Sequence, residues 1–283
     1  MKSILVATDL SARSDRALHK ALNLAKIYAA NLTILHVIDE DSPEILHKDL
    51  TRLAKKGIFE TIEGKTQGVD YKIEIVVGNP HAKVLQTALK VKADLVILGL
   101  HRHTTKNNSM MGKVIERVIK GSLKPVLVVK DSSKSEYKKI LVATDFNTHS
   151  KNSLTLALSL FPDANFTLMH SYHMPFLGVA GVSTSDLEDD YRKDCENEMK
   201  ELSKEVVKKL SKLSNNKAIS SYKIKNKLEN GSIIDVLNKE VLYSKHQLLV
   251  IGTRGRSGFS RMLSLNVAET FLIDPPCDVL VTF

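Results

Sequence analysis

The chain has 283 residues, a net charge of +9, 43% hydrophobic residues and 26% charged residues. This composition excludes a disordered chain, and the short apolar runs exclude a transmembrane helix, which needs about 20 consecutive apolar residues. Cys195 and Cys277 are too few for a disulfide framework, and the N-terminus does not resemble a secretory signal, so we expect a globular, cytoplasmic protein without a membrane partner.

The positive charge is unevenly but diffusely distributed. Residues 1–136 contain 22 Lys/Arg and 15 Asp/Glu, a net of +7, and residues 137–283 contain 19 and 17, a net of +2. The excess is mostly lysine, and the sequence has no Arg-rich arm, zinc-finger spacing or RNA-recognition signature. We therefore expect a solvated basic surface and no nucleic-acid partner.

Five short apolar segments in the first half predict β-strands. They are residues 4–8, 31–37, 71–77, 95–98 and 126–129. Between the first two, residues 14–30 place apolar side chains at helical spacing, which predicts a helix. Such alternation of continuous apolar strands with helices indicates a parallel sheet covered on both faces.

The second half repeats the first. The segment KSILVATDLS at residues 2–11 reappears as KKILVATDFN at residues 138–147, an offset of 136. DLVILG at 94–99 returns as QLLVIG at 247–252, and PVLV at 125–128 as DVLV at 278–281, both at an offset of 153. The longer offset indicates an insertion near residues 172–190. We therefore predict a first domain at residues 1–131, a polar linker at 132–137 and a second domain at 138–283, both doubly wound α/β domains.

The second half also contains the longest predicted helix, at residues 187–213. Apolar side chains recur in it at intervals of three and four residues: Tyr191, Cys195, Met199, Leu202, Val206, Leu210 and Leu213. Such a stripe is typical of a buried helix face, so Cys195 is expected in the core. Cys277, just before the last predicted strand, is expected to be a buried structural thiol.

Ligands of doubly wound sheets bind beyond the carboxyl ends of the strands, where the strand order reverses. This rule selects the ends of the first, second and fourth strands of each half. The residues concerned are Ala7, Thr8, Asp9, Val37 and Gly99 in the first half, and Ala143, Thr144, Asp145, Ser171 and Gly252 in the second. After the fourth strand of the second half, GTRGRSGFSR at 252–261 offers the main-chain N–H groups and arginines that suit a phosphate.

These motifs resemble the universal stress proteins of the UspA type, in their tandem two-domain form. The resemblance rests on ILVATD in both halves, ADLVILG, GTRGRSG and PVLVV, and it covers essentially the whole chain. It implies that each domain is an open five-stranded parallel sheet with helices on both faces, the fold of the adenine-nucleotide alpha-hydrolase-like (HUP) class. ATP-binding members carry Gly-x2-Gly-x9-Gly-Ser/Thr after strand four, an aspartate after strand one and main-chain contacts after strand two.

The second domain departs from the family motif at its end. Gly252 and Gly255 match it, but Leu265 stands where the third glycine is expected, and Asn266, followed by Val267, stands at the Ser/Thr position. An isobutyl group at Leu265 replaces a bare main chain against phosphate. Asn266 still offers an amide donor, so the second domain is the better nucleotide candidate.

The first domain departs from the motif at other positions. Gly99 and Gly112 match it, whereas Arg102 replaces the second glycine and Lys113 replaces the hydroxyl residue. The two cations either hold a bound anion or fill the empty cleft and pair with Asp9. Asp9 itself is either a ligand residue or a cap for the following helix.

Other patterns are weaker. His101 and His103, with His36 and His81 elsewhere, lack the cysteine or acidic partners of a zinc site, so no metal is expected. Residues 174–182 of the insertion are apolar, and they form either a packed lid or a flap or apolar surface for a ligand or partner.

Two functions follow from the resemblance. The first is a non-catalytic stress-resistance protein that needs no cofactor and binds a ligand or partner, with its two domains paired within the chain and a homodimer as a further option. The second is an ATP- or AMP-binding switch or weak ATPase that uses the Gly252–Gly258 loop. A metal- or lipid-binding protein that uses the insertion is a remote third.

Overall fold

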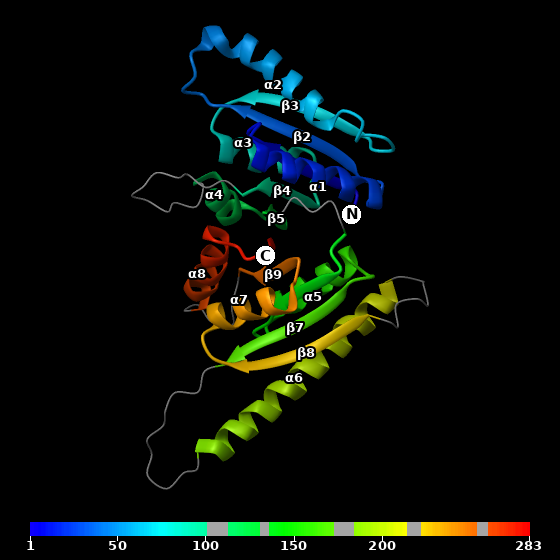
Figure 1. Ribbon diagram of the computed structural model, residues 1–283, viewed down its shortest axis with the longest axis vertical. Helices are drawn as coiled ribbons and strands as arrows, with labels where there is room; N and C mark the ends of the chain where they lie inside the picture. Colours follow the sequence, from blue (N-terminus) through cyan, green and yellow to red (C-terminus); the bar gives the residue numbers. More distant parts are fainter. Residues whose placement is uncertain (101–112, 131–135, 173–183, 214–221, 254–259) are drawn as a thin grey trace. The chain divides into compact units, whose positions relative to one another are not determined.

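The computed structural model describes residues 1–100, 113–130, 136–172, 184–213, 222–253 and 260–283; within these ranges it leaves out the side chains of residues 113, 184–186, 213 and 260–266. The contacts divide the chain into two compact units (Figure 1). Unit 1 comprises Met1–Ser135 and Leu272–Val281, and unit 2 comprises Glu136–Phe271 and Thr282–Phe283. Unit 1 therefore combines the first repeat with a strand from the end of the chain.

Unit 1 alternates strands and helices. In chain order these are β1 (Ser3–Thr8), α1 (Ala12–Tyr28), β2 (Asn31–Ile38), the short 3-10 helix η1 (Glu44–Leu46), α2 (His47–Ile62), β3 (Tyr71–Val77), α3 (Pro80–Lys90), β4 (Leu95–Gly99), α4 (Lys113–Gly121), β5 (Val126–Val129) and β10 (Asp278–Thr282). The strands follow the order β3-β2-β1-β4-β5-β10. All neighbours are parallel except β5 and β10. The strand order reverses between β1 and β4.

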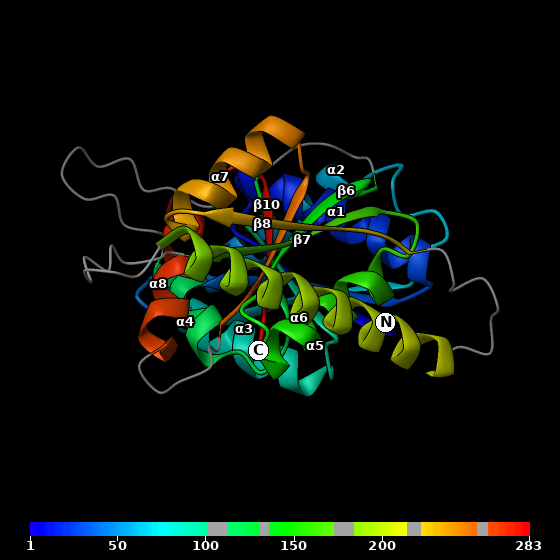
Figure 2. The ribbon, with the colours of Figure 1, turned by 90° about the horizontal axis from the view of Figure 1, so that it is seen from below.

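Unit 2 repeats this plan. Its elements are β6 (Lys139–Ala143), α5 (Thr148–Leu160), β7 (Asn165–Tyr172), α6 (Thr184–Leu213), β8 (Lys223–Asn230), α7 (Ile233–Ser244), β9 (Leu248–Gly252) and α8 (Ser260–Ile273). The strands follow the order β9-β6-β7-β8, and all neighbours are parallel. In Figure 2, α5 and α6 lie on one side of β7 and β8, and α7 lies on the other.

The apolar strands form because both faces of the sheet are covered. Ile4, Leu5 and Val6 of β1 are fully buried, as are Ile140, Leu141 and Val142 of β6. Burying such a side chain contributes about 1.5–3 kcal/mol, which explains why these strands read as continuous apolar runs. The predicted doubly wound α/β fold is thereby confirmed.

Helix α6 accounts for much of the extra length of the second repeat. It has 30 residues, whereas its counterpart α2 has 16, a difference of 14. In the insertion expected at residues 172–190, Tyr172 ends β7 and residues 184–190 begin α6. Residues 174–182, predicted as a lid or flap, lie outside the described residues.

Among the stripe residues of α6 whose side chains are described, all but one face the core. Cys195 is buried, as are Met199, Leu202, Val206 and Leu210. The expectation for Tyr191 was wrong, because its side chain is 42% exposed. Its ring contacts that of Tyr172 in a tilted arrangement, with 5.7 Å between the centroids. Within the described ranges, no helix is long and apolar enough to cross a membrane.

Candidate functional site

The turn after β1 is held by its own polar side chains. The Ser14 hydroxyl donates to the main-chain oxygen of Ser11, so the 2.9 Å contact between the Thr8 and Ser14 hydroxyls has Thr8 as its donor. Thr8 Oγ1 also accepts from the N–H of Leu10 at 3.0 Å. Asp9 Oδ1 accepts from the N–H of Ser11 at 3.0 Å, and Ser11 in turn caps α1 by accepting from the N–H of Ser14. The Thr8 hydroxyl proton is therefore committed within the turn.

The turn after β6 repeats this network. Thr144 Oγ1 donates to the Ser150 hydroxyl at 3.1 Å, and Ser150 donates to the main-chain oxygen of Asn147 at 3.0 Å. Asn147 caps α5 by accepting from the N–H of Ser150 at 2.8 Å. Asp145 accepts from Asn147 through both carboxylate oxygens, at 3.3 Å from the main-chain N–H and 2.8 Å from the side-chain amide. Of the two roles left open for Asp9, the helix cap thus belongs to Ser11 instead, and in the second turn it belongs to Asn147; the aspartates orient these two residues.

Both turns contain a left-handed residue that is not glycine. Leu10 and Phe146 have φ of +64°, a conformation that costs an L-residue roughly 1–2 kcal/mol. Phe146 stacks on His170, with 4.4 Å between the ring centroids. Leu10 remains 39% exposed. The duplicated hydrogen bonds hold the same strained turn in place in both units.

In each unit, one histidine binds the turn to the neighbouring strand. Neither histidine was predicted at this edge from the sequence. His36 Nδ1 lies 2.9 Å from the main-chain oxygen of Thr8, and His170 Nδ1 lies 2.8 Å from that of Thr144. Because a carbonyl only accepts, Nδ1 carries the proton in both rings. The signal was present in the repeat, since His36 and His170 fall at matching positions in LTILHV and FTLMHS.

The remaining predicted residues of β1, β2, β6 and β7 lie at the same two edges. Ala7 pairs with Leu35 and Leu98, and Ala143 pairs with Met169, so both alanines lie beside the neighbouring strands. Val37 pairs with Val76 near the end of β2. The Ser171 hydroxyl donates to the main-chain oxygen of Gly231 at 2.7 Å, which commits its proton to the loop after β8.

The two glycines that end the fourth strands have different surroundings. A Cβ on Gly99 would lie 2.8 Å from Ser14 Cα and 2.9 Å from the main-chain oxygen of Arg13. Real Cβ atoms do not approach backbone so closely, so α1 can cross β4 only at a glycine. A Cβ on Gly252 would meet the Ser153 hydroxyl at 3.2 Å, and its next neighbours are 3.9 Å away. Packing thus explains Gly99 more fully than Gly252.

Several predicted site residues lie outside the described residues. These are Arg102, Gly112 and Gly255, together with the side chains of Lys113 and Asn266. His101 and His103 also fall outside, as does the proposed pairing of Arg102 and Lys113 with Asp9. Val267 lies in α8. Among the residues that are described, no group of three or more His, Cys, Asp or Glu could hold a metal ion.

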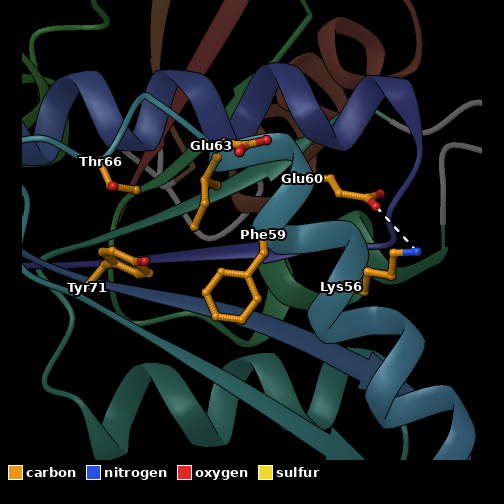
Figure 3. Close-up of a pocket in the computed structure, with 7 residues that line it drawn as sticks. Lys56, Phe59, Glu60, Glu63, Thr66 and Tyr71 are labelled. Atoms are coloured by element: carbon orange, nitrogen blue, oxygen red, sulfur yellow. Dashed lines mark ion pairs between the residues drawn. The ribbon is translucent and has the colours of Figure 1, made fainter.

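An open groove of about 600 Å³ lies between α2 and the start of the edge strand β3 (Figure 3). Its lining consists of Lys56, Phe59, Glu60, Ile62, Glu63, Thr66 and Tyr71. The rings of Phe59 and Tyr71 face the hollow, and Lys56 pairs with Glu60 at 3.7 Å along its rim. Tyr71 begins β3, so the groove lies at the opposite end of the strands from the predicted ligand site.

Unit 2 also contains a buried ionic cluster between β8 and α7. Glu240, which is 6% exposed, accepts from Lys227 Nζ at 2.6 Å and from the Ser244 hydroxyl at 2.8 Å. His246 Nε2 lies 3.3 Å from Glu240 Oε1, and His246 Nδ1 is buried without a hydrogen-bond partner. Burial opposes ionisation of Glu240, but the three hydrogen bonds together lower the pKa of its carboxyl. Burial also lowers the pKa of His246, so its ring is neutral.

Comparison with known proteins gives consistent matches. The profile of the Universal stress protein family matches residues 1–130 and 136–282. Universal stress protein MJ0577 of Methanocaldococcus jannaschii is 32% identical over 155 residues, which cover 46% of this chain and 94% of that protein. The crystal structure of a universal stress protein from Archaeoglobus fulgidus DSM 4304 shares the fold, with a TM-score of 0.70 and 17% identity over 99% of this chain and 97% of that one. Another solved universal stress protein, described in complex with cAMP, is 28% identical over 47% of this chain and 98% of its own, with a TM-score of 0.36.

Proposed function

The chain belongs to the universal stress protein family, and we propose that it acts in stress resistance as a non-catalytic protein that binds a ligand or partner, with two degenerate nucleotide sites. Because the chain carries two family domains in tandem, we also propose that these domains pair within one chain.

The proposal is supported above all by the internal use of the polar groups at the predicted ligand edges. The hydroxyl protons of Thr8 and Thr144 are committed to neighbouring serines, and that of Ser171 is committed to a carbonyl. A phosphate would have to break these bonds, at a cost of about 1 kcal/mol each, before a hydroxyl could donate to it.

The glycine motif supports the same proposal. Gly99 is needed where α1 crosses β4, so its presence is explained without a ligand. At three further motif positions, Arg102 and Leu265 replace glycines and Lys113 replaces the hydroxyl residue that the family uses against phosphate. Arg102 and Leu265 each put a side chain where the motif has a bare main chain, and Lys113 replaces a short hydroxyl with a long cationic side chain.

The histidines at these edges have a structural role in the two turns. His36 and His170 donate Nδ1–H to the main-chain oxygens of Thr8 and Thr144. These contacts bind each turn to the neighbouring strand, so the fold explains both histidines without a reaction.

The nucleotide-switch alternative keeps one observation in its favour. Packing explains Gly252 less completely than Gly99, because its closest neighbour is the tip of the Ser153 side chain. Space for a Cβ at Gly252 is compatible with selection of glycine for the approach of a ligand. The alternative predicts saturable ATP or AMP binding by the Gly252–Gly258 loop.

Titration of the intact chain with a fluorescent ATP analogue separates the two functions. We expect no low-micromolar binding, and we expect the double variant Leu265→Gly, Asn266→Ser to bind more tightly than the natural chain. Gly255→Arg in the background of that double variant is the matched control and should abolish the gain. Low-micromolar binding by the natural chain that Gly255→Arg abolishes would establish the switch instead.

A further inference from the structure

A second hollow in unit 1 combines positive charge with an apolar floor. It has a volume of about 380 Å³ and is lined by Arg13, Arg16, Leu100, Val129, Lys130 and Asp274. Leu100 directly follows β4, and Val129 ends β5, so the hollow lies at the carboxyl ends of two parallel strands, one of which, β4, borders the point where the strand order reverses. Its size falls within the range of small-molecule sites, about 300–1,000 Å³.

The cations of this hollow are held in place by main-chain oxygens. Arg16 Nη1 donates to the main-chain oxygen of Lys130 at 2.7 Å, and Lys130 Nζ donates to that of Pro275 at 2.6 Å. The main-chain N–H of Lys130 donates to Asp278 at 2.8 Å, which fixes the base of the lysine. Such carbonyl contacts orient the cationic groups without neutralising their charge.

The charge balance leaves the hollow positive. Its lining contains three cations and one carboxylate, a formal net charge of +2. Within the part of the chain that the structure describes, the side chains of Arg16 and Lys130 form no ion pair with a carboxylate. An arginine has five N–H donors and a lysine has three, so both retain donors for a ligand. Leu100 and Val129 add two buried apolar side chains to the lining.

We propose that this hollow binds a compact phosphate-bearing anion, held by the side chains of Arg16 and Lys130. Apart from Leu100, which directly follows Gly99, the lining lies outside the family's glycine motif, and neither cation that holds the anion is a motif residue. Two positioned cations suit the two charged oxygens of a phosphate group, and the small volume selects pyrophosphate or a small phosphate monoester over a bulky ligand.

Two probes test the proposal on the full chain at low salt: inorganic pyrophosphate and glycerol phosphate, each titrated while the amide NMR signals of Leu100, Val129 and Lys130 are followed. We expect saturable shifts of these signals with at least one probe. The probe that binds identifies the source of the phosphate group as inorganic or ester-linked. The absence of saturable shifts with both probes would overturn the proposal.

Four charge variants make the test specific. Arg16→Gln and Lys130→Gln remove a charge but keep an amide donor for the main-chain oxygen, and each should weaken binding about tenfold, the loss expected for one charged hydrogen bond. Lys26→Gln on α1 and Arg117→Gln on α4 remove the same charge outside the hollow and should leave the affinity unchanged. Equal weakening by all four variants would show a non-specific surface effect and contradict the site.

A variant that keeps the positive charge separates the effect of the charge from a loss of structure. Arg16→Lys keeps the charge with fewer donors and should retain most of the affinity that Arg16→Gln loses. The thermal unfolding midpoint of each variant is measured alongside. If Arg16→Lys and Arg16→Gln lose binding equally while both remain folded, the charge of Arg16 does not hold the anion and the proposal fails.

Discussion

The outer strands of the two units carry ion pairs of opposite polarity at the same position of the sheet. On β3, Glu74 lies beside Leu35 and pairs with Lys72 and with Lys90 of α3. On β8, Lys227 lies beside Met169 and pairs with Glu240 of α7. Leu35 and Met169 occupy matching places in the repeat, so the carboxylate has moved from the strand to the helix. The fold therefore accepts either polarity for the contact between outer strand and helix.

The turns beside the predicted ligand edges behave differently. Hydroxyl, carboxylate and histidine contacts recur in both turns with the same atoms, although Ser11 is replaced by Asn147. A left-handed turn needs a fixed set of partners, whereas an ion pair needs only opposite charges at the right separation. The two halves therefore share the backbone geometry of these turns, whereas the placement of charge on the outer strand and helix differs between them.

The largest difference between the units should appear when the two carboxylates are removed. Glu240→Ala leaves His246 without its acceptor and Lys227 paired with Glu229, and it should lower the free energy of unfolding of unit 2 by about 3 kcal/mol, because Glu240 is buried. Glu74→Ala should cost unit 1 at most about 1 kcal/mol, because the Lys72 and Lys90 side chains are 54% and 67% exposed. Hydrogen exchange of peptides from each unit, measured in urea, assigns the loss. Equal losses in the two units would contradict the comparison.

The two strand-ending glycines should also differ. Gly99→Ala forces the new methyl group against the α1 backbone and should destabilise unit 1 by about 2 kcal/mol. Gly252→Ala meets only the Ser153 hydroxyl and should cost unit 2 less than about 1 kcal/mol. Urea unfolding followed by circular dichroism measures both changes. A larger loss for Gly252→Ala would show that packing does not distinguish the two positions.

Acid should weaken unit 2 before unit 1. The pKa of His246 is lowered from its ordinary 6.5, so the unfolded state takes up the proton first and stability is lost as the pH falls from 6.5 toward the folded pKa. The loss is at most about 1.4 kcal/mol per pH unit. The hydrogen bond from Lys72 lowers the pKa of Glu74 in unit 1 from 4.5. Burial opposes ionisation of Glu240 in unit 2, but its hydrogen bonds outweigh burial and lower its pKa from 4.5 as well. Both carboxylates therefore contribute stability that is lost only as the pH falls below about 4.5.

The control for this pH dependence is His246→Gln, which keeps an N–H donor for Glu240 and does not titrate. Hydrogen exchange of unit 2 is compared between pH 6.5 and 4.5 for the natural chain and the variant. The variant should lose less stability over that interval. Identical pH profiles would assign the acid sensitivity to another group.

The smallest expected effect is the difference between the two units when the matching threonine is replaced in each. Thr8→Val and Thr144→Val each remove the hydroxyl that bridges a serine and a main-chain N–H, and each should cost about 1–2 kcal/mol, with values equal within about 0.5 kcal/mol. Thermal unfolding of the two variants provides the comparison. A large inequality would show that the shared turn contributes differently to the two units.

The sequence predicts the fold well because its strands are continuous apolar runs and because short strand segments of the first half recur in the second with few changes. Strand ends fell within a residue or two of those observed, and Cys195 and Cys277 are buried as expected. The exposure of Tyr191 was missed because helical periodicity assigns a face to every position but does not report how much of that face the neighbouring elements cover.

The candidate site was predictable only in part. Because topology fixes which residues lie at the ends of β1 and β6, the location of Thr8, Asp9, Thr144 and Asp145 at these strand ends was predictable; their role as ligand residues stays a prediction. The Nδ1 contacts of His36 and His170 and the backbone crossing at Gly99 depend on atoms brought together by packing, which periodicity does not report. The hollow between Arg16 and Lys130 joins residues 114 apart in sequence, and no motif marks it.

Equilibrium dialysis of the purified chain against radiolabelled ATP and AMP tests the central proposal most directly, because it counts occupied sites without a reporter group. We predict no saturable binding in the low-micromolar range for either nucleotide. One equivalent of nucleotide bound tightly per chain and released by Gly255→Arg, or an equivalent that stays bound in that variant, would contradict the proposal that both predicted nucleotide sites have lost the means to hold a triphosphate.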